Sequence, residues 1–434
     1  MNKNPKDKDQ NKKDKLTKLE IAWILYDVGN SAFTMLACAL IPIWFKTLAI
    51  GNGAGQITSD KATAYWALIV SLITIITAVI DPFIGAIMDY KGRKKIFFIA
   101  SVTVGALGCF LTGFSTTWIM FTIIYVICRI AYSISLLVYD SMLRDVTSEE
   151  RLDIVSTHGY GWGYLGSCIP FIIAIIVYVM GPDMLGIISN RLTMILGFGI
   201  TALWWFVATI PLMKGYQQIY YVKKEKGAVK DIFSKLGNTI KSIIFEDKKV
   251  LFFLIAFFLY IDGVGAIIDN CINIGTDLGL NTVGQVSTLV GTQIVAFIFS
   301  LVFVKLTRKY KTITLIKVCI IGYLGVCLYA LTLHNLLGFA MLALAVGVFQ
   351  GAIQSLSRSY YTKIIPAEKS GEYFGIYDIF AKGSSFLGSA VLGLVKLMGG
   401  TINIAVASLA GFFILGYIFI HITEKYHENK IENK

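Results

Sequence analysis

Histidine and cysteine are scarce in this sequence, and the few that occur form none of the patterns that build catalytic or metal sites. The 434 residues include four histidines and seven cysteines, and no two cysteines are spaced as Cys-x-x-Cys. The cysteines lie within or beside apolar stretches, so they are interpreted as small packing residues. No His-Glu-x-x-His motif, Gly-Lys-Ser/Thr phosphate loop or serine elbow occurs. We therefore expect no enzyme, no metal site and no cofactor.

Charged residues are also scarce, and long apolar runs take their place. They make up 15% of the chain, against 56% for hydrophobic residues, and the mean hydropathy is +0.69. A water-soluble protein of this length cannot bury so much apolar surface. Runs of about 20 apolar residues can cross a bilayer as helices, so the sequence predicts an all-α membrane protein whose first partner is the lipid bilayer. Its twelve expected spans cover residues 20–49, 62–88, 95–115, 117–140, 156–180, 189–212, 249–275, 282–306, 313–333, 335–357, 371–398 and 401–423.

Basic residues are distributed unevenly between the connections. They gather in the tails and in alternate connections, such as Lys91–Lys95, while the opposite connections hold little more than Lys61 and Arg191. The positive-inside rule then places both termini in the cytoplasm. The formal net charge of +12 reflects this topology and not a nucleic-acid-binding face. We expect a multi-pass protein of a bacterial plasma membrane that binds no nucleic acid.

The longest connection divides the spans into six and six. Residues 214–248 separate an N-terminal bundle over 19–213 from a C-terminal bundle over 249–423, with tails at 1–18 and 424–434. Apolar residues at helical spacing within the connection predict an amphipathic helix on the inner membrane surface; a solvated linker is the alternative. Weak sequence echoes between the halves are typical of two pseudo-symmetric bundles.

Polar side chains within the spans need an explanation, because a charge at the centre of a span costs about 2.5–3.5 kcal/mol on insertion scales. Asp262 and Asp269 share one stripe of a helix and are candidates to bind a cation or take up protons. Lys382 is a candidate to bind an anionic group, although Asp378 four residues earlier can neutralise it. Helix packing or a gate ion pair is the alternative for the carboxylates. The expected substrate- or ion-binding residues are Asp27, Asn30, Arg129, Asp262, Asp269, Gln293, Gln354, Asp378 and Lys382.

A charged motif, GAIMDYKGRKK, covers residues 85–95 between the second and third spans. Its glycines suit a tight turn, and we expect a side chain at Gly92 to block the approach of the helices. Asp89 can accept hydrogen bonds from a helix end or bind an arginine, with Arg144 as a candidate. Asp140 and Arg144 end the fourth span and are expected to pair with this loop. The expected gating residues are Gly85, Asp89, Gly92, Arg93, Asp140, Arg144 and Arg358.

Twelve spans divided six and six, with this motif after the second, resemble the major facilitator superfamily. One departure is Tyr90, where that superfamily commonly has Arg or Lys. The segments WILYDVGNSAF, LRDVTSEERLDIVSTHGYGWGYLGS and SLSRSYYTKIIPAEKSGEYFGIYDIFAKGSSFLGS are similar to its vacuole effluxer-like branch. The residues that match the signatures of this branch are Asp27, Asn30, Ser31, Arg358, Glu372, Gly375 and Lys382.

The resemblance implies a function as well as a fold. Fungal members of the branch are associated with amino-acid export from the vacuole, and most bacterial members have no defined substrate. We expect a monomeric secondary transporter whose two six-helix bundles work by alternating access. Its expected cargo is a small polar organic solute, an amino acid first, coupled to H⁺. A drug or amphipath efflux transporter of the same fold is one alternative, and a non-transporting receptor or scaffold is the other.

Overall fold

The computed structural model describes residues 15–38, 40–50, 57–183, 190–223, 232–383 and 386–432. Most of the expected N-terminal tail, residues 1–14, lies outside this range. The described residues form helices, and twelve stretches are long and apolar enough to cross a membrane. The expected all-α membrane fold with twelve spans is therefore confirmed.

The spans follow one another in two sets of six. The first set comprises α2 (Lys18–Cys38) with α3 (Leu40–Ile50), α4 (Ser59–Met88), α5 (Arg93–Thr112), α6 (Trp118–Ser141), α8 (Leu152–Asp183) and α9 (Asn190–Gly215), with a short α7 (Leu143–Val146) before α8. The second set comprises α11 (Lys248–Asp269) with α12 (Cys271–Asp277), α13 (Thr282–Leu306), α14 (Thr312–Tyr329), α15 (Leu336–Ile364), α16 (Ser370–Gly383) with α17 (Phe386–Leu397), and α18 (Ile402–Ser408) with α19 (Ala410–Glu432).

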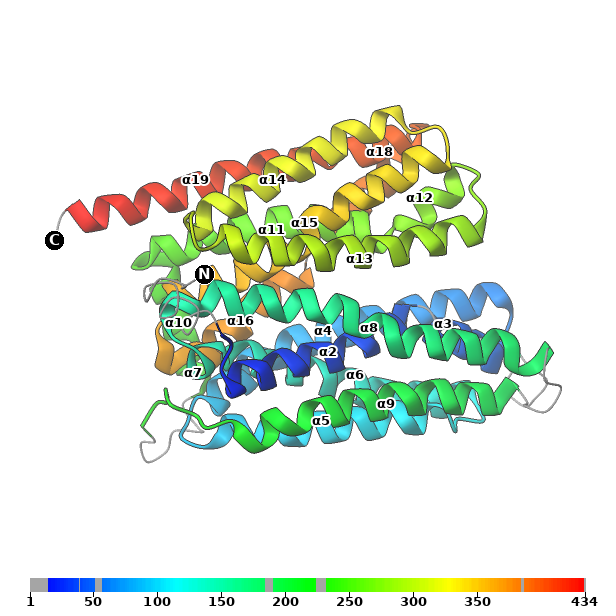
Figure 1. Ribbon diagram of the computed structural model, residues 1–434, viewed down its shortest axis with the longest axis horizontal. Coiled ribbons are helices and arrows are strands. Elements are labelled where there is room, and N and C mark those ends of the chain that lie inside the picture. Colours follow the sequence, from blue (N-terminus) through cyan, green and yellow to red (C-terminus); the bar gives the residue numbers. More distant parts are fainter. Residues whose placement is uncertain are drawn as a thin grey trace, which may run out of the picture.

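The two sets of helices form two halves that lie side by side (Figure 1). In the first half α2 packs on α8 and α9, and in the second α11 packs on α19 and α14 on α15. The halves meet where α8 contacts α13 and α15, and where α4 contacts α16. Both described ends of the chain lie at one end of the molecule, together with α7 and α10 (Figure 1), and this end is called the terminal end below. The opposite end is called the far end.

Side-chain caps start five spans at the far end. In each case a threonine or asparagine oxygen accepts a hydrogen bond from the backbone N–H three residues later. Such a cap satisfies one of the N–H groups that the first turn of a helix leaves unpaired. The capping residues are Thr58, Thr117, Asn281, Asn335 and Thr401.

The connection between the halves contains helix α10 (Ile232–Phe245), which packs on α4 and α11. Ile232, Leu236 and Ile243 are buried on one face of α10, whereas Phe233 on another is 75% exposed. Residues 224–231 of the expected connection lie outside the described range. At the other end of the chain, α19 continues through the expected C-terminal tail to Glu432.

Large apolar side chains cover the outside of both halves. Leu68, Ile75, Ile123 and Leu203 are each more than half exposed, as are many others along the spans. Contiguous apolar surface of this kind is suited to lipid and not to water. The chain is therefore an integral, multi-pass membrane protein.

Candidate functional site

A charged cluster joins the halves where α4 meets α16. The ammonium group of Lys382 donates to a carboxylate oxygen of Asp81 and, at 3.2 Å, to Asp378 Oδ2. Ser133 of α6 donates to Asp81 Oδ2 at 3.3 Å. Asp81 is fully buried, and Asp378 is 9% exposed. Two carboxylates therefore share one ammonium, and Ser133 supplies a further hydroxyl donor to Asp81.

Asp81 is absent from the expected site residues, although the sequence contains a signal for it. It stands between Ile80 and Pro82 in a long apolar span, where an ionisable residue is expensive. The i,i+4 pair of Asp378 and Lys382 forms as its spacing suggests. What the spacing could not reveal is that the ammonium also reaches the opposite half.

A second charged cluster surrounds Arg358 on the side of the terminal end. Its Nη1 donates to Asp140 Oδ1 at 2.9 Å, and its Nη2 lies 3.6 Å from Asp27 Oδ2. Asn30 donates to Asp27 Oδ1 at 3.3 Å. Arg358 comes from the second half and its carboxylate partners come from the first, so this cluster also joins the halves.

Asp89 at the end of α4 binds the start of α16. Its two carboxylate oxygens accept hydrogen bonds from the backbone N–H groups of Gly371 and Glu372, both at 2.8 Å. Lys94 lies 3.7 Å from Asp89 and 3.5 Å from Asp145, with no exposed surface. Burial raises the pKa of Asp89 to about 7, against the opposing charge of Lys94. The helix end that Asp89 binds thus belongs to the opposite half.

The expected partners of the loop over 85–95 are wrong in two respects. Arg144 does not reach Asp89; it pairs with Glu149 at 2.6 Å near the surface. Asp140 does not pair with the loop either, because it binds Arg358. Asp140 and Arg144 are four residues apart, but α6 ends at Ser141 and the turn directs their side chains to different partners.

The two glycines of this loop, Gly85 and Gly92, serve different purposes: Gly92 forms the tight turn, as expected, but it is not where the helices approach closely. Gly92 has φ = 76°, and a Cβ there would meet no atom within 4 Å, so it does not serve the approach of the helices. A side chain at Gly92 is disfavoured by the left-handed backbone alone. The close approach is at Gly85, where a Cβ would lie 2.7 Å from the carbonyl carbon of Gly371.

Tyr90 links this loop to the connection between the halves, and Arg93 lies against it. Tyr90 is 4% exposed, and its hydroxyl accepts a hydrogen bond from Lys235 of α10 at 3.2 Å. The guanidinium of Arg93 lies 5.9 Å from the centre of the Tyr90 ring. The unusual tyrosine therefore serves as a contact for helix α10.

A third ion pair between the halves lies at the terminal end. Asp153 of α8 accepts from Lys363 at 2.6 Å, from Ser359 at 2.6 Å and from Thr312 at 2.7 Å. Sequence reasoning missed this carboxylate, which occupies the first turn of a span beside other polar residues. At this end the first half supplies the carboxylates of Asp153 and Asp89, and the second half supplies the donors.

The remaining expected residues are spread over the spans. Asp262 is fully buried in α11, but Asp269 at the end of that helix is exposed, so the two carboxylates that were expected to act together lie in different surroundings. Arg129 lies over the ring of Tyr132, 5.0 Å from its centre. Gln354 is half-buried on α15.

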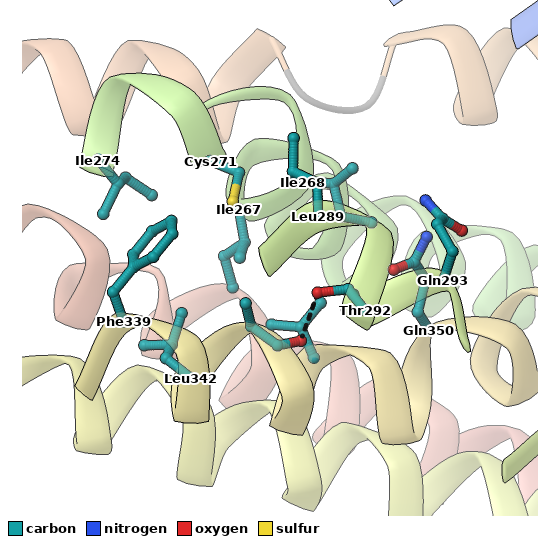
Figure 2. Close-up of a pocket in the computed structure, with 12 residues that line it drawn as sticks. Ile267, Ile268, Cys271, Ile274, Leu289, Thr292, Gln293, Phe339, Leu342 and Gln350 are labelled. Carbon is teal, nitrogen blue, oxygen red and sulfur yellow. Dashed lines mark hydrogen bonds between the residues drawn. The ribbon is translucent and has the colours of Figure 1, made fainter. Parts of the chain in front are cut away.

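A cavity of about 40 Å³ lies in the second half among α11, α12, α13 and α15 (Figure 2). The amides of Gln293 and Gln350 lie at one side of it, and Thr292 donates to the carbonyl of Ala343 at 3.3 Å. Most of its other lining residues are apolar, among them Phe339. This room suits a few water molecules, so an organic solute requires it to widen.

Solved structures of low sequence identity share this architecture. A crystal structure of the transporter FucP in the outward conformation matches with a TM-score of 0.71 and 14% identity, over 93% of this chain and 98% of that one. The human organic anion transporter MFSD10 matches with a TM-score of 0.68 and 12% identity, over 94% and 100%. These structures show that the chain has the fold of major facilitator transporters, with two six-helix halves.

Sequence comparisons identify the branch. A family model described as "Vacuole effluxer Atg22 like" matches residues 17–151 and 144–430. The chain belongs to this family, which confirms the resemblance. An MFS-type transporter of Bacillus subtilis, YxiO, is 37% identical over 94% of this chain and 95% of its own length.

Fungal relatives match a smaller share. Autophagy-related protein 22-1 of Aspergillus niger is 28% identical over 60% of this chain and 45% of its own length. The chain thus spans about half the length of this fungal relative.

Proposed function

We propose that this protein moves a small polar organic solute, an amino acid first, across a bacterial plasma membrane by alternating access. The closed terminal end supports this proposal. Asp89, Asp153 and Arg358 all join the halves there, so opening that end means breaking a limited set of polar contacts. The basic connections support a cytoplasmic location for both termini. The protein works as a monomer, since each half finds its partner within the same chain.

The observation that carries the proposal is the cluster of Asp81, Asp378 and Lys382. A buried charge is tolerated only when it is paired, and here two carboxylates share one ammonium. The unbalanced negative charge favours uptake of a proton or of a cationic group of the cargo. We therefore propose H⁺ coupling through Asp81 or Asp378. An isolated pair with a merely structural role would need only one carboxylate.

The apolar lining of the cavity favours a second candidate function. Nine of its twelve lining residues are apolar, and the other three are Thr292, Gln293 and Gln350. An amphipathic or drug-like molecule suits such a surface. In that case the charged cluster would serve the coupling ion, and the cavity would take the cargo.

A thermal-shift screen on the detergent-purified protein tests the cargo class. Amino acids, peptides, sugars, nucleosides and cationic drugs are compared at matched concentration, because a ligand that binds the native state raises its apparent stability. We expect amino acids to stabilise the wild-type protein and to lose this effect in Lys382→Ala. Stabilisation by drugs alone would favour the second function. Binding without flux in proteoliposomes would favour a receptor.

A further inference from the structure

The side chain of Arg358 occupies a complete guanidinium site that is built by the opposite half. Its Nη1 donates to Asp140 at 2.9 Å, and its Nη2 lies 3.6 Å from Asp27. Its Nε donates to Ser156 Oγ at 3.0 Å, and its Nη2 to the Ser156 carbonyl at 3.1 Å. Arg358 is only 2% exposed. The guanidinium is thus matched by two carboxylates and two further acceptors from α2, α6 and α8.

Three aromatic rings complete this site. The guanidinium carbon lies 4.4 Å from the ring centre of Tyr160, 4.6 Å from that of Trp23 and 5.3 Å from that of Tyr139. Aromatic faces attract cations at such distances, and the attraction strengthens away from water. The site therefore has the composition of a receptor for an organic cation.

Contacts within the first half hold three of these groups, Trp23, Tyr139 and Asp27, in place. The rings of Trp23 and Tyr139 stack with centres 4.2 Å apart, and Trp23 Nε1 donates to the Tyr139 carbonyl at 3.1 Å. The Tyr139 hydroxyl donates to Asp27 Oδ2 at 3.1 Å. None of these contacts uses Arg358, so the positions of Trp23, Tyr139 and Asp27 do not depend on the present occupant of the site. Asp140 pairs with Arg358 itself, and the Ser156 hydroxyl donates to the Ser355 carbonyl of α15 at 2.7 Å.

Alternating access separates the halves at the terminal end, and Arg358 then leaves with α15. Asp27 and Asp140 would remain within a cage of aromatic rings, and unpaired carboxylates in such surroundings are costly. We propose that the site which Arg358 vacates receives the guanidinium or ammonium group of a basic amino acid, with Arg358 as a tethered competitor. This inference rests on the proposed function and specifies its cargo. The return of Arg358 would displace the cargo toward Asp378 and Asp81 and close the end behind it.

Chemical rescue tests the site without any transport assay. In purified full-length Arg358→Ala, millimolar methylguanidinium is expected to raise the apparent unfolding temperature by about 3 °C. Methylurea, which has a similar shape but no charge, should give no shift. The effect should vanish in Arg358→Ala/Asp140→Asn and be absent in the wild type. Equal shifts with methylguanidinium and methylurea would overturn the proposal.

Counterflow in wild-type proteoliposomes tests the cargo, and it does not require the variant to fold. Labelled arginine should exchange at least about tenfold faster than citrulline, its neutral analogue, because the site's carboxylates would otherwise stay unpaired. Exchange of neutral amino acids without arginine or lysine would overturn this inference and leave the proposed function standing. If no amino acid exchanged at all, the amino-acid cargo of both the proposed function and this inference would be contradicted. Rescue by methylguanidinium would then still establish the cation site.

Discussion

Asp81 of α4 and Lys382 of α16 form an ion pair that joins the two halves of the chain. Asp81 has no exposed surface, and the ammonium of Lys382 also serves Asp378. Breaking a buried pair by removing one partner costs about 3–5 kcal/mol, because the other charge stays buried. Separating the halves at this pair would therefore leave a buried charge unpaired unless a proton or the cargo neutralised it.

Replacing Lys382 should disable transport while the protein still inserts. In Lys382→Ala, two carboxylates lose their shared counter-ion, and we expect solute flux to fall at least about tenfold. Lys396→Ala is the matched control, since Lys396 pairs with Asp277 in a largely exposed position. Flux into proteoliposomes at equal protein content measures both variants. Near-normal flux in Lys382→Ala would exclude the assigned role.

The contact between Asp89 and the start of α16 should respond to pH. Burial raises the pKa of Asp89 to about 7 in the closed state, so that state binds a proton which the open state releases. Acidification through pH 7 therefore favours closure, and a higher pH weakens it. The distance between spin labels at the exposed positions Lys91 and Lys369 reports closure. We expect Asp89→Asn to lose this pH dependence and the exposed control Asp60→Asn to keep it; an identical profile in all three proteins would contradict the role.

Gly85 should tolerate no side chain in the closed state. A Cβ at Gly85 would lie 2.7 Å from the carbonyl carbon of Gly371, so Gly85→Ala should hold the terminal end open and slow turnover severalfold. Gly325→Ala is the control, because a Cβ there meets no atom within 4 Å in helix α14. The distance between spin labels at Lys91 and Lys369 measures the opening, and the counterflow rate measures the turnover. Wild-type values for Gly85→Ala would show that the contact is dispensable.

The pH dependence of flux should follow Asp378 and not Asp269. Asp378 shares an ammonium with a second carboxylate between the halves, whereas Asp269 is exposed. We expect Asp378→Asn to flatten the pH profile of uptake and Asp269→Asn to leave it intact. Uptake is measured at a series of external pH values with a fixed membrane potential. If Asp269→Asn flattened the pH profile and Asp378→Asn left it intact, the coupling residue would lie in α11 instead.

The sequence was sufficient for the fold because the bilayer constrains it so strongly. Apolar runs of fixed length and the alternation of basic connections predict twelve spans and two halves, and both are observed. Helical spacing likewise predicted the pair of Asp378 and Lys382. Features that lie within one helix, and so follow its period, can be predicted from a single sequence.

Contacts between distant spans were not predictable in the same way. Arg144 and Asp140 end the fourth span on the same expected side of the membrane as the loop over 85–95. Asp140 nevertheless binds Arg358, which is 218 residues away. Asp89 accepts hydrogen bonds from a helix end, as expected, but the sequence did not identify that helix end as the start of α16 in the opposite half. Asp81 was visible as a charge in an apolar span and was missed. Packing of the two halves decides these partners.

The most direct test of the central claim is solute flux through the purified protein. Proteoliposomes are loaded with unlabelled amino acids, and uptake of each labelled amino acid is followed in wild type and Lys382→Ala. Alternating access with a charged cluster between the halves predicts exchange in the wild type and at least about tenfold less in Lys382→Ala. Ligand binding without exchange in the wild type would contradict the account.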